Sequence, residues 1–278
     1  MRRLGSALAR RGFAALIVWS PEMRSLRVSA HDTQLLVSAY QWLIDRPDID
    51  ADRCGFLGTC VGGGFAPMAA AQPEIRDQVR FVTCFAPFGS LRTLALDIGS
   101  GTTEIDGLRR PWPVDQLSRR VYVRTLTAHL DPAEAMRLET AWFERQPLPQ
   151  PDGLSAAARA LLPILLTSDR VELARRLDQL PELRQTVDAV DPVGVAGDVR
   201  AAVVTIGHDR DDLVVPFGES QRLFAALPRG AEVSLTEFHL FQHADPTKRK
   251  MAKVTLVREL WKFVRFCGPA LRCGDRAF

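Results

Sequence analysis

The pattern of hydrophobic and polar positions alternates between short apolar runs and segments with helical spacing. The runs have the length of strands and lie at 13–18, 55–58, 81–85, 201–206 and 232–236. Strands that are apolar on both faces and are separated by helices are typical of a parallel sheet covered by helices. The pattern therefore predicts an α/β fold.

The predicted helices between these runs have recognisable ends and faces. They span 3–11, 31–45, 61–71 and 217–227, with a further helix at the C-terminus. In the second helix, Asp32 is the expected N-cap, and the expected core face is Leu35, Leu36, Ala39, Trp42 and Leu43. The last helix is expected to end at Gly268 and to turn these residues toward the core: Val254, Val257, Leu260, Trp261 and Val264.

The alternation of strands and helices is interrupted between residues 89 and 198, where the apolar spacing is helical throughout. Asp131 and the proline after it predict the start of one helix. Further helices are predicted at 155–166, 169–179 and 181–189. We therefore expect residues 89–198 to be a helical cap, or lid, inserted into a core that is formed by 1–88 and 199–278.

Composition supports a globular protein and limits its partners. The chain has 278 residues, of which 46% are hydrophobic, and its net charge of +3 is too small to indicate a nucleic acid or a membrane surface as a partner. The basic cluster at 248–253 is typical of a solvated helix face. The longest uncharged stretch, 54–73, contains five glycines and two prolines, so no membrane span is expected.

The cysteines are odd in number and show no C-x-x-C spacing. They are Cys54, Cys60, Cys84, Cys267 and Cys273. This pattern indicates neither a disulfide framework nor a structural zinc site, and it favours a reducing, cytoplasmic location. The arginine pairs near the N-terminus precede an apolar run that is too short for an export signal. We expect no metal and no cofactor.

A glycine-rich turn places Cys60 between a predicted strand and a predicted helix. The sequence Gly58-Thr59-Cys60-Val61-Gly62 has the spacing of the nucleophile elbow, G-x-S-x-G, with cysteine in place of serine. We expect glycine to be required at positions 58 and 62, because side chains there would keep the strand and the helix from passing closely. The helix N-terminus favours a thiolate, and the Val61 N–H is a candidate oxyanion donor. Such turns also serve in packing or in phosphate binding.

Two later loops carry candidate partners for this cysteine. Residues 207–216 follow a predicted strand, at the position from which a catalytic acid would project. Asp212 is the first candidate because it lies four residues before a proline; Asp211 is the second and Asp209 the third, and a solvated turn is the alternative. His243 lies in the loop after the last predicted strand, whereas His239 is closer to the strand and is expected to be a packing residue.

These motifs together make the chain resemble the α/β-hydrolase family over nearly its whole length. The elbow that includes Gly63, G-x-C-x-G-G, is similar to that of dienelactone hydrolases, whereas the long helical block resembles capped, esterase-like members. The resemblance implies that Cys60 is the nucleophile, His243 the base and Asp212 the acid that orients it. It also implies a hydrolase of carboxylic esters, thioesters or lactones, with a small-molecule acyl substrate.

The start of the chain departs from the family pattern. In that pattern the third strand lies between the fourth and fifth, and the loop after it supplies a second oxyanion donor. Here 13–18 corresponds to the fourth strand and 55–58 to the fifth, so the N-terminal strands are expected to be missing, by truncation, or rearranged, and the chain to be weak or inactive. The alternatives are a non-catalytic protein that binds a ligand or partner, and an acyltransferase that uses the same triad.

Overall fold

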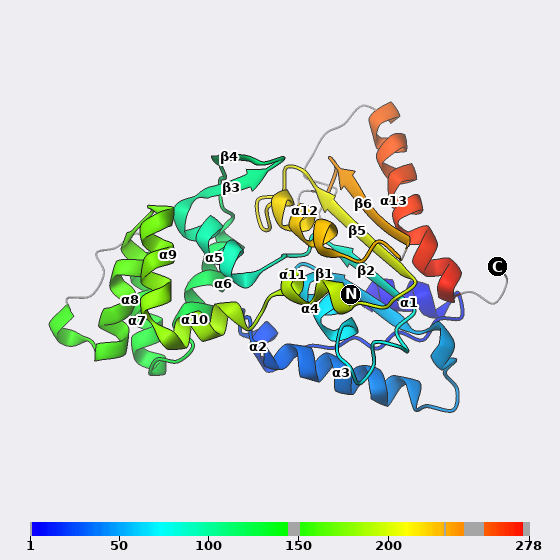
Figure 1. The fold of residues 1–278 in the computed structure, drawn as a ribbon, viewed down its shortest axis with the longest axis horizontal. Coiled ribbons are helices and arrows are strands. Elements are labelled where there is room, and N and C mark those ends of the chain that lie inside the picture. The colour runs from blue at the N-terminus through cyan, green and yellow to red at the C-terminus, as the bar shows by residue number, and fades with distance from the viewer. Residues whose placement is uncertain (1, 144–150, 231, 242–252, 275–278) are drawn as a thin grey trace.

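The structure is a computed structural model that describes residues 2–143, 151–230, 232–241 and 253–274. It consists of a lobe built on a parallel sheet and a lobe of helices, which lie on the right and on the left in Figure 1. The helical lobe is formed by the chain between the second and third strands of the main sheet.

The main sheet confirms the predicted α/β architecture. In the described residues it has four strands, β1 (Gly55–Thr59), β2 (Phe81–Phe85), β5 (Val203–Asp209) and β6 (Glu232–Phe238), in the order β1-β2-β5-β6. Every neighbouring pair is parallel. The carboxyl ends of all four strands therefore meet at one edge of the sheet, where the loops that carry the candidate residues begin.

Helices cover both faces of this sheet. On one face, α3 (His31–Ile44), α4 (Val61–Ala70) and α12 (Phe217–Ala226) share an apolar cluster with β2 and β5. On the other face, α13 (Lys253–Gly274) packs through Phe266 against Phe85 and Phe238. Because β5 is covered on both faces, it is buried along its whole length.

The helical lobe contains the four helices predicted between residues 131 and 189, and two more. Its elements are α5 (Leu91–Ser100), α6 (Gln116–Leu126), α7 (Pro132–Phe143), α8 (Ala156–Leu166), α9 (Arg170–Gln179) and α10 (Pro181–Asp188). The short helix α11 (Pro192–Val195) follows them and lies against α4 and α12 of the sheet lobe (Figure 1). Asp131 caps α7 as predicted, because its Oδ1 accepts a hydrogen bond from the Ala133 N–H (2.9 Å). The other short elements are α1 (Arg2–Ala9), α2 (Pro21–Arg24), η1 (Ala51–Arg53), η2 (Pro151–Gly153) and η3 (Ala196–Asp198).

The prediction of helical structure throughout 89–198 is wrong at a β-hairpin. Strands β3 (Thr102–Ile105) and β4 (Leu108–Pro111) pair antiparallel across a two-residue turn. Asp106 and Gly107 form this turn with φ values of +55° and +74°. An Asp-Gly pair is the preferred sequence for such a turn because both positions need positive φ.

The predicted strand at 13–18 is also wrong. These residues have no regular structure, and Leu16 and Ile17 are 42% and 43% exposed. A strand needs a neighbour to satisfy its backbone groups, and no strand of the described residues pairs with this run. The first strand of the described chain is β1, which lies at the edge of the sheet.

Two helices turn a different face to the core from the one predicted. In α3 the N-cap is Ala30, Asp32 is buried, and Trp42 is 56% exposed. In α13, Val254 is 82% exposed and Trp261 is 58% exposed, and the helix continues past Gly268. The sheet beneath α13 presents the rings of Phe85 and Phe238, so Phe266 of this helix is buried in place of its valines. None of the helices in the described ranges has both the length and the apolar character of a membrane span.

Candidate active site

Cys60 occupies a strained turn at the junction of β1 and α4. Its backbone has φ +54° and ψ −121°, a combination that residues other than glycine rarely adopt. The Cys60 N–H donates to the Phe85 carbonyl (2.9 Å), and the Cys60 carbonyl accepts from the Gly63 N–H (2.9 Å). Backbone hydrogen bonds on both sides of the residue therefore hold the strained conformation in place.

The glycines of this turn have different roles. A Cβ on Gly58 would lie 2.1 Å from the carbonyl oxygen of Gly62, so Gly58 allows the strand and the helix to approach. A Cβ on Gly62 would meet nothing within 4 Å, so the prediction that this glycine is required for packing is wrong. Gly63 is tight against Phe85 and Pro87, with contacts of 3.2 Å for an added Cβ.

The other thiols lie in surroundings that oppose ionisation. Burial raises the pKa of Cys84 to about 12 and that of Cys267 to about 11. Burial also raises the pKa of Cys54 and of Cys273. Because the thiolate is the reactive form, these four cysteines are expected to react slowly at neutral pH. Cys60 differs from them in lying, half-buried, at the N-terminus of a ten-residue helix.

Asp212 lies in the loop after β5 with its side chain buried. Its Oδ1 accepts hydrogen bonds from the Val214 N–H (2.7 Å) and the Val215 N–H (3.2 Å). Donors of this kind stabilise a carboxylate and fix its orientation. Strand β2 separates β5 from β1, so the two strands that carry Asp212 and Cys60 run about 10 Å apart.

The two alternative acids are placed differently from Asp212. Asp209 is buried at the end of β5, where its Oδ2 accepts from the Phe241 N–H (2.6 Å) and its Oδ1 accepts from the Asp211 N–H (3.0 Å). It therefore connects the end of β5 to the loop that follows β6. Asp211 is exposed at the surface of the turn.

The histidine candidates are only partly within the described residues. His243 lies outside them, so the structure brings Cys60 and Asp212 to one edge of the sheet without placing the third candidate. His239 is at the end of β6, where its Nε2 lies 3.0 Å from a carboxylate oxygen of Glu237. Its backbone N–H donates to Glu259 on α13 (2.9 Å).

The helical lobe holds the loop that carries Asp212, a feature that sequence reasoning missed. Three successive carbonyls of this loop accept hydrogen bonds from the segment after β4 and from the first turn of α6. The Trp112 Nε1–H donates to the Asp212 carbonyl (3.0 Å), the Asp115 N–H donates to that of Leu213 (2.8 Å), and the Ser118 hydroxyl donates to that of Val214 (2.5 Å). No local sequence pattern signals contacts over about a hundred residues.

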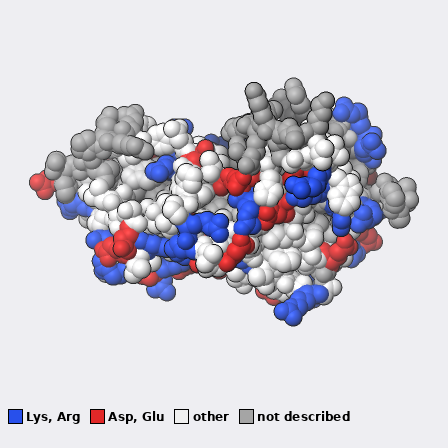
Figure 2. Space-filling view, turned by 90° about the horizontal axis from the view of Figure 1, so that it is seen from above, with Lys and Arg blue, Asp and Glu red and all other residues white. Residues whose placement is uncertain are grey.

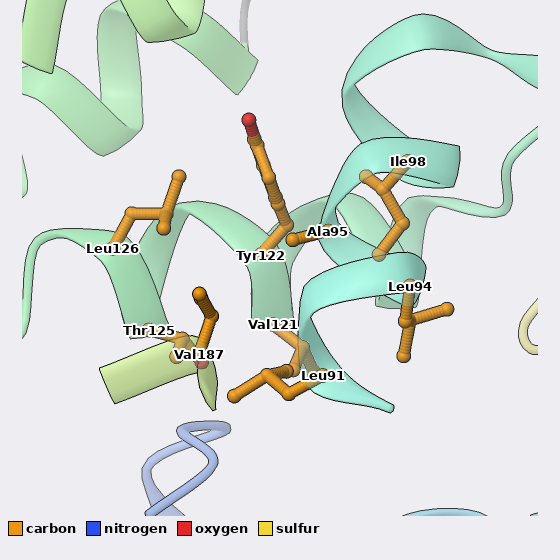
Figure 3. A pocket seen from close by; sticks show the side chains of 9 residues that line it. All are labelled: Leu91, Leu94, Ala95, Ile98, Val121, Tyr122, Thr125, Leu126 and Val187. Atoms are coloured by element: carbon orange, nitrogen blue, oxygen red, sulfur yellow. The ribbon is translucent and has the colours of Figure 1, made fainter. Parts of the chain in front are cut away.

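A small cavity lies inside the helical lobe. Side chains of α5 and α6, together with Val187 of α10, line it (Figure 3). Its volume is about 20 Å³, room for about one water molecule. Because an acyl group is far larger than one water molecule, this cavity is not a substrate pocket.

Charges on the surface are mixed in sign. Figure 2 shows acidic and basic side chains interspersed over one face of the molecule. Several of them form ion pairs; Arg210, for example, contacts Asp106 in the hairpin turn and Glu237 on β6 (2.8 Å for the second pair). Such pairs connect the hairpin to the carboxyl ends of the central strands.

A parallel sheet carries a strained residue at a strand-to-helix turn and a buried acid after a later strand, and a helical block is inserted between them. The chain has the α/β-hydrolase fold.

Comparisons with known proteins give only distant similarities. No family model matches it. It is 36% identical over 89 residues to a probable 2-oxo-3-(5-oxofuran-2-ylidene)propanoate lactonase of a Bradyrhizobium species, a match that covers 27% of this chain and 36% of the relative. The chain thus spans about a third of the curated relative that it matches.

Solved structures with a similar arrangement are also hydrolases by name. Acetyl xylan esterase 1 from Thermoanaerobacterium is 14% identical, with a TM-score of 0.43, over 95% of this chain and 61% of that one. The meta-cleavage product hydrolase of Pseudomonas fluorescens is 18% identical, with a TM-score of 0.38, over 86% of this chain and 72% of that one. These likenesses are too distant to bear on the activity of this chain.

Proposed function

We propose that this chain is the core of a hydrolase that cleaves carboxylic esters, thioesters or lactones through an acyl intermediate on Cys60. The observation that carries the proposal is the positive φ of Cys60 at the turn between β1 and α4. Strain of this kind persists only where the surrounding structure imposes it, and it is concentrated at functional sites. Asp212, buried and held at the same edge of the sheet, supplies the acid of the proposed triad.

The proposed reaction has two steps. The Cys60 thiolate attacks the acyl carbon, His243 protonates the departing alcohol, thiol or ring oxygen, and a thioester to Cys60 remains. Water then attacks this thioester while His243 takes its proton, which releases the carboxylic acid and restores the Cys60 thiolate beside the protonated imidazole. Asp212 orients the imidazole and stabilises its charged form. The Val61 N–H, in the first turn of α4, donates to the developing oxyanion.

The substrate class follows from the helical block and from one relative. We assign residues 89–198 as a cap over the core formed by 1–88 and 199–278, with small acyl compounds as substrates. The curated relative that covers part of the chain is named as a probable lactonase, so lactones belong in the first panel of substrates. Neither step of the proposed reaction uses a metal or a cofactor.

Alkylation of the thiol tests the nucleophile. The native protein is treated with iodoacetamide at pH 7 and the labelled peptides are mapped by mass spectrometry, with Cys60→Ala and Cys54→Ala as a matched pair. We expect fast labelling of native protein and of Cys54→Ala, and its loss in Cys60→Ala, because burial raises the pKa of the Cys54 thiol. Equal labelling of the two variants would reject Cys60 as the reactive thiol.

Turnover tests the reaction. Native protein is assayed with p-nitrophenyl esters of short and long acyl chains, a thioester and a five-membered unsaturated lactone. We expect hydrolysis that is lost in Cys60→Ala and in His243→Ala and is strongly reduced in Asp212→Asn. Specific labelling of Cys60 without turnover of any substrate would instead favour a binding protein. An acyl group that passes to an added alcohol faster than to water would favour an acyltransferase.

A further inference from the structure

A buried histidine lies next to Asp212, the proposed acid. His208 lies on β5 with no exposed surface, and its side chain faces the loop that carries Asp212. Its Nε2 lies 2.9 Å from the Val215 carbonyl oxygen and 3.4 Å from Oδ2 of Asp212. Its Nδ1 lies 2.6 Å from the Ser220 hydroxyl on α12. One ring thus connects the central strand, the acid loop and a core helix.

The partners of His208 define where its proton lies. A backbone carbonyl only accepts hydrogen bonds, so Nε2 carries the proton and donates it to Val215. The Ser220 hydroxyl is in hydrogen-bond distance of Nδ1, so both ring nitrogens have a partner. The nitrogen that donates to Val215 also lies 3.4 Å from Oδ2 of Asp212.

His208 acts on Asp212 in two ways. Its hydrogen bond to the Val215 carbonyl holds the loop whose backbone N–H groups, of Val214 and Val215, donate to Oδ1 of Asp212. Its Nε2 also lies 3.4 Å from Oδ2, which adds an electrostatic attraction on that side of the carboxylate. Together these contacts restrain the direction in which the carboxylate points.

We infer that His208 is a positioning residue for Asp212 in the proposed reaction. The inference rests on the proposed function, in which Asp212 orients the base. Catalysis is sensitive to such placement, because a displacement of about 1 Å can reduce turnover by about 100-fold. A residue that only fills the core would act through its volume, whereas His208 acts through the hydrogen atom on Nε2.

Two substitutions of similar polarity separate these roles. In His208→Gln the side-chain amide nitrogen lies near the former position of Nε2 and can still donate toward Val215 and Asp212. In His208→Asn the shorter side chain reaches only the former position of Nδ1, so the contact with Ser220 is kept and the donor toward Asp212 is lost. The two variants therefore differ at the atom that the inference concerns.

Turnover is measured for both variants beside Asp212→Asn, with melting temperatures as the control for folding. We expect kcat of His208→Gln to stay within about threefold of the native value, and kcat of His208→Asn to fall about 10-fold to 100-fold with KM nearly unchanged. Equal kcat values in the two variants would overturn the inference. A native kcat in Asp212→Asn would instead show that the proposed acid itself is wrong.

Ser220→Ala keeps the test decisive if either variant fails to fold. It leaves His208 in place and removes only the hydroxyl that holds Nδ1, which frees the ring to turn. We expect kcat to fall at least threefold while KM is retained. A native kcat in Ser220→Ala would also count against the inference.

Discussion

Gly58 is the elbow glycine that we expect to be irreplaceable, and Gly62 provides its matched control. A Cβ on Gly58 would lie 2.1 Å from the carbonyl oxygen of Gly62 and 2.8 Å from the Gly63 nitrogen. All of these contacts are with backbone, so no side chain can rotate away. Strand β1 and helix α4 would have to separate by about 1 Å to restore ordinary contact distances.

The expected cost of Gly58→Ala follows from that displacement. Overpacking typically costs about 1 to 3 kcal/mol, and a clash with rigid backbone belongs at the upper end. A loss of about 3 kcal/mol is a large part of the usual stability of about 5 to 15 kcal/mol. In a chain of this size it would lower the melting temperature by roughly 6 to 12 °C.

Gly62→Ala is expected to have the opposite effect on stability. The added Cβ meets nothing within 4 Å, and Gly62 lies inside α4, where alanine is favoured over glycine by about 1 kcal/mol. Urea unfolding followed by circular dichroism measures the unfolding free energy of both variants. Equal changes in the two, or a native stability in Gly58→Ala, would refute the steric account of the elbow. Turnover of Gly62→Ala then reports separately on whether the open space beside the elbow receives substrate.

Three further changes test how the lobes are held together. Burial and the nearby charge of Glu219 raise the pKa of Asp97 to about 6, so the native protein loses stability as the pH rises from about 4 through 6. Over pH 4 to 7 the unfolding free energy of Asp97→Asn should therefore gain up to about 3 kcal/mol relative to that of the native protein. Parallel curves of unfolding free energy against pH for the two proteins would contradict this. Ser118→Ala removes the hydroxyl that is bonded to the Val214 carbonyl and should lower kcat by about threefold. Its control is Ser100→Ala, which removes a similar bond inside α5 and should leave kcat native; equal kcat values in the two variants would contradict a role of Ser118 in placing the loop. Glu219→Ala removes the carboxylate that accepts from two backbone N–H groups before α5 (2.6 and 3.0 Å). The unfolding free energy should fall by about 3 kcal/mol or more, and hydrogen exchange at those two amides should become faster. Native exchange rates at these amides would contradict the prediction.

Local patterns were sufficient to predict the sheet and the elbow. The apolar character of β1, β2, β5 and β6 is visible in the sequence; β2 and β5, inside the sheet, are buried, and β1 and β6 are partly exposed. The turn around Cys60 was predictable because its glycine spacing encodes the geometry of a single strand-to-helix junction. In each case the information needed lies within about ten residues.

The remaining features depend on partners that are distant in sequence. The run at 13–18 has the composition of a strand but finds no strand beside it. The spacing of apolar residues in the last helix predicted a core face that includes Val254 and Trp261, whereas the aromatic rings of Phe85 and Phe238 bury Phe266 instead. His208 was overlooked for the same reason, because its importance comes from the loop opposite it and from Ser220 on another helix.

The position of the proposed acid depends on both lobes of the molecule. Four successive carbonyls, from Asp212 to Val215, accept hydrogen bonds; the helical lobe donates to the first three and His208 of the core donates to the fourth. Because the carboxylate of Asp212 is itself bonded to the backbone of this loop, any shift of the helical lobe would move it relative to Cys60. In the proposed reaction the helical lobe would therefore help to align Asp212, and we expect a shift of this lobe to change the position of the proposed acid.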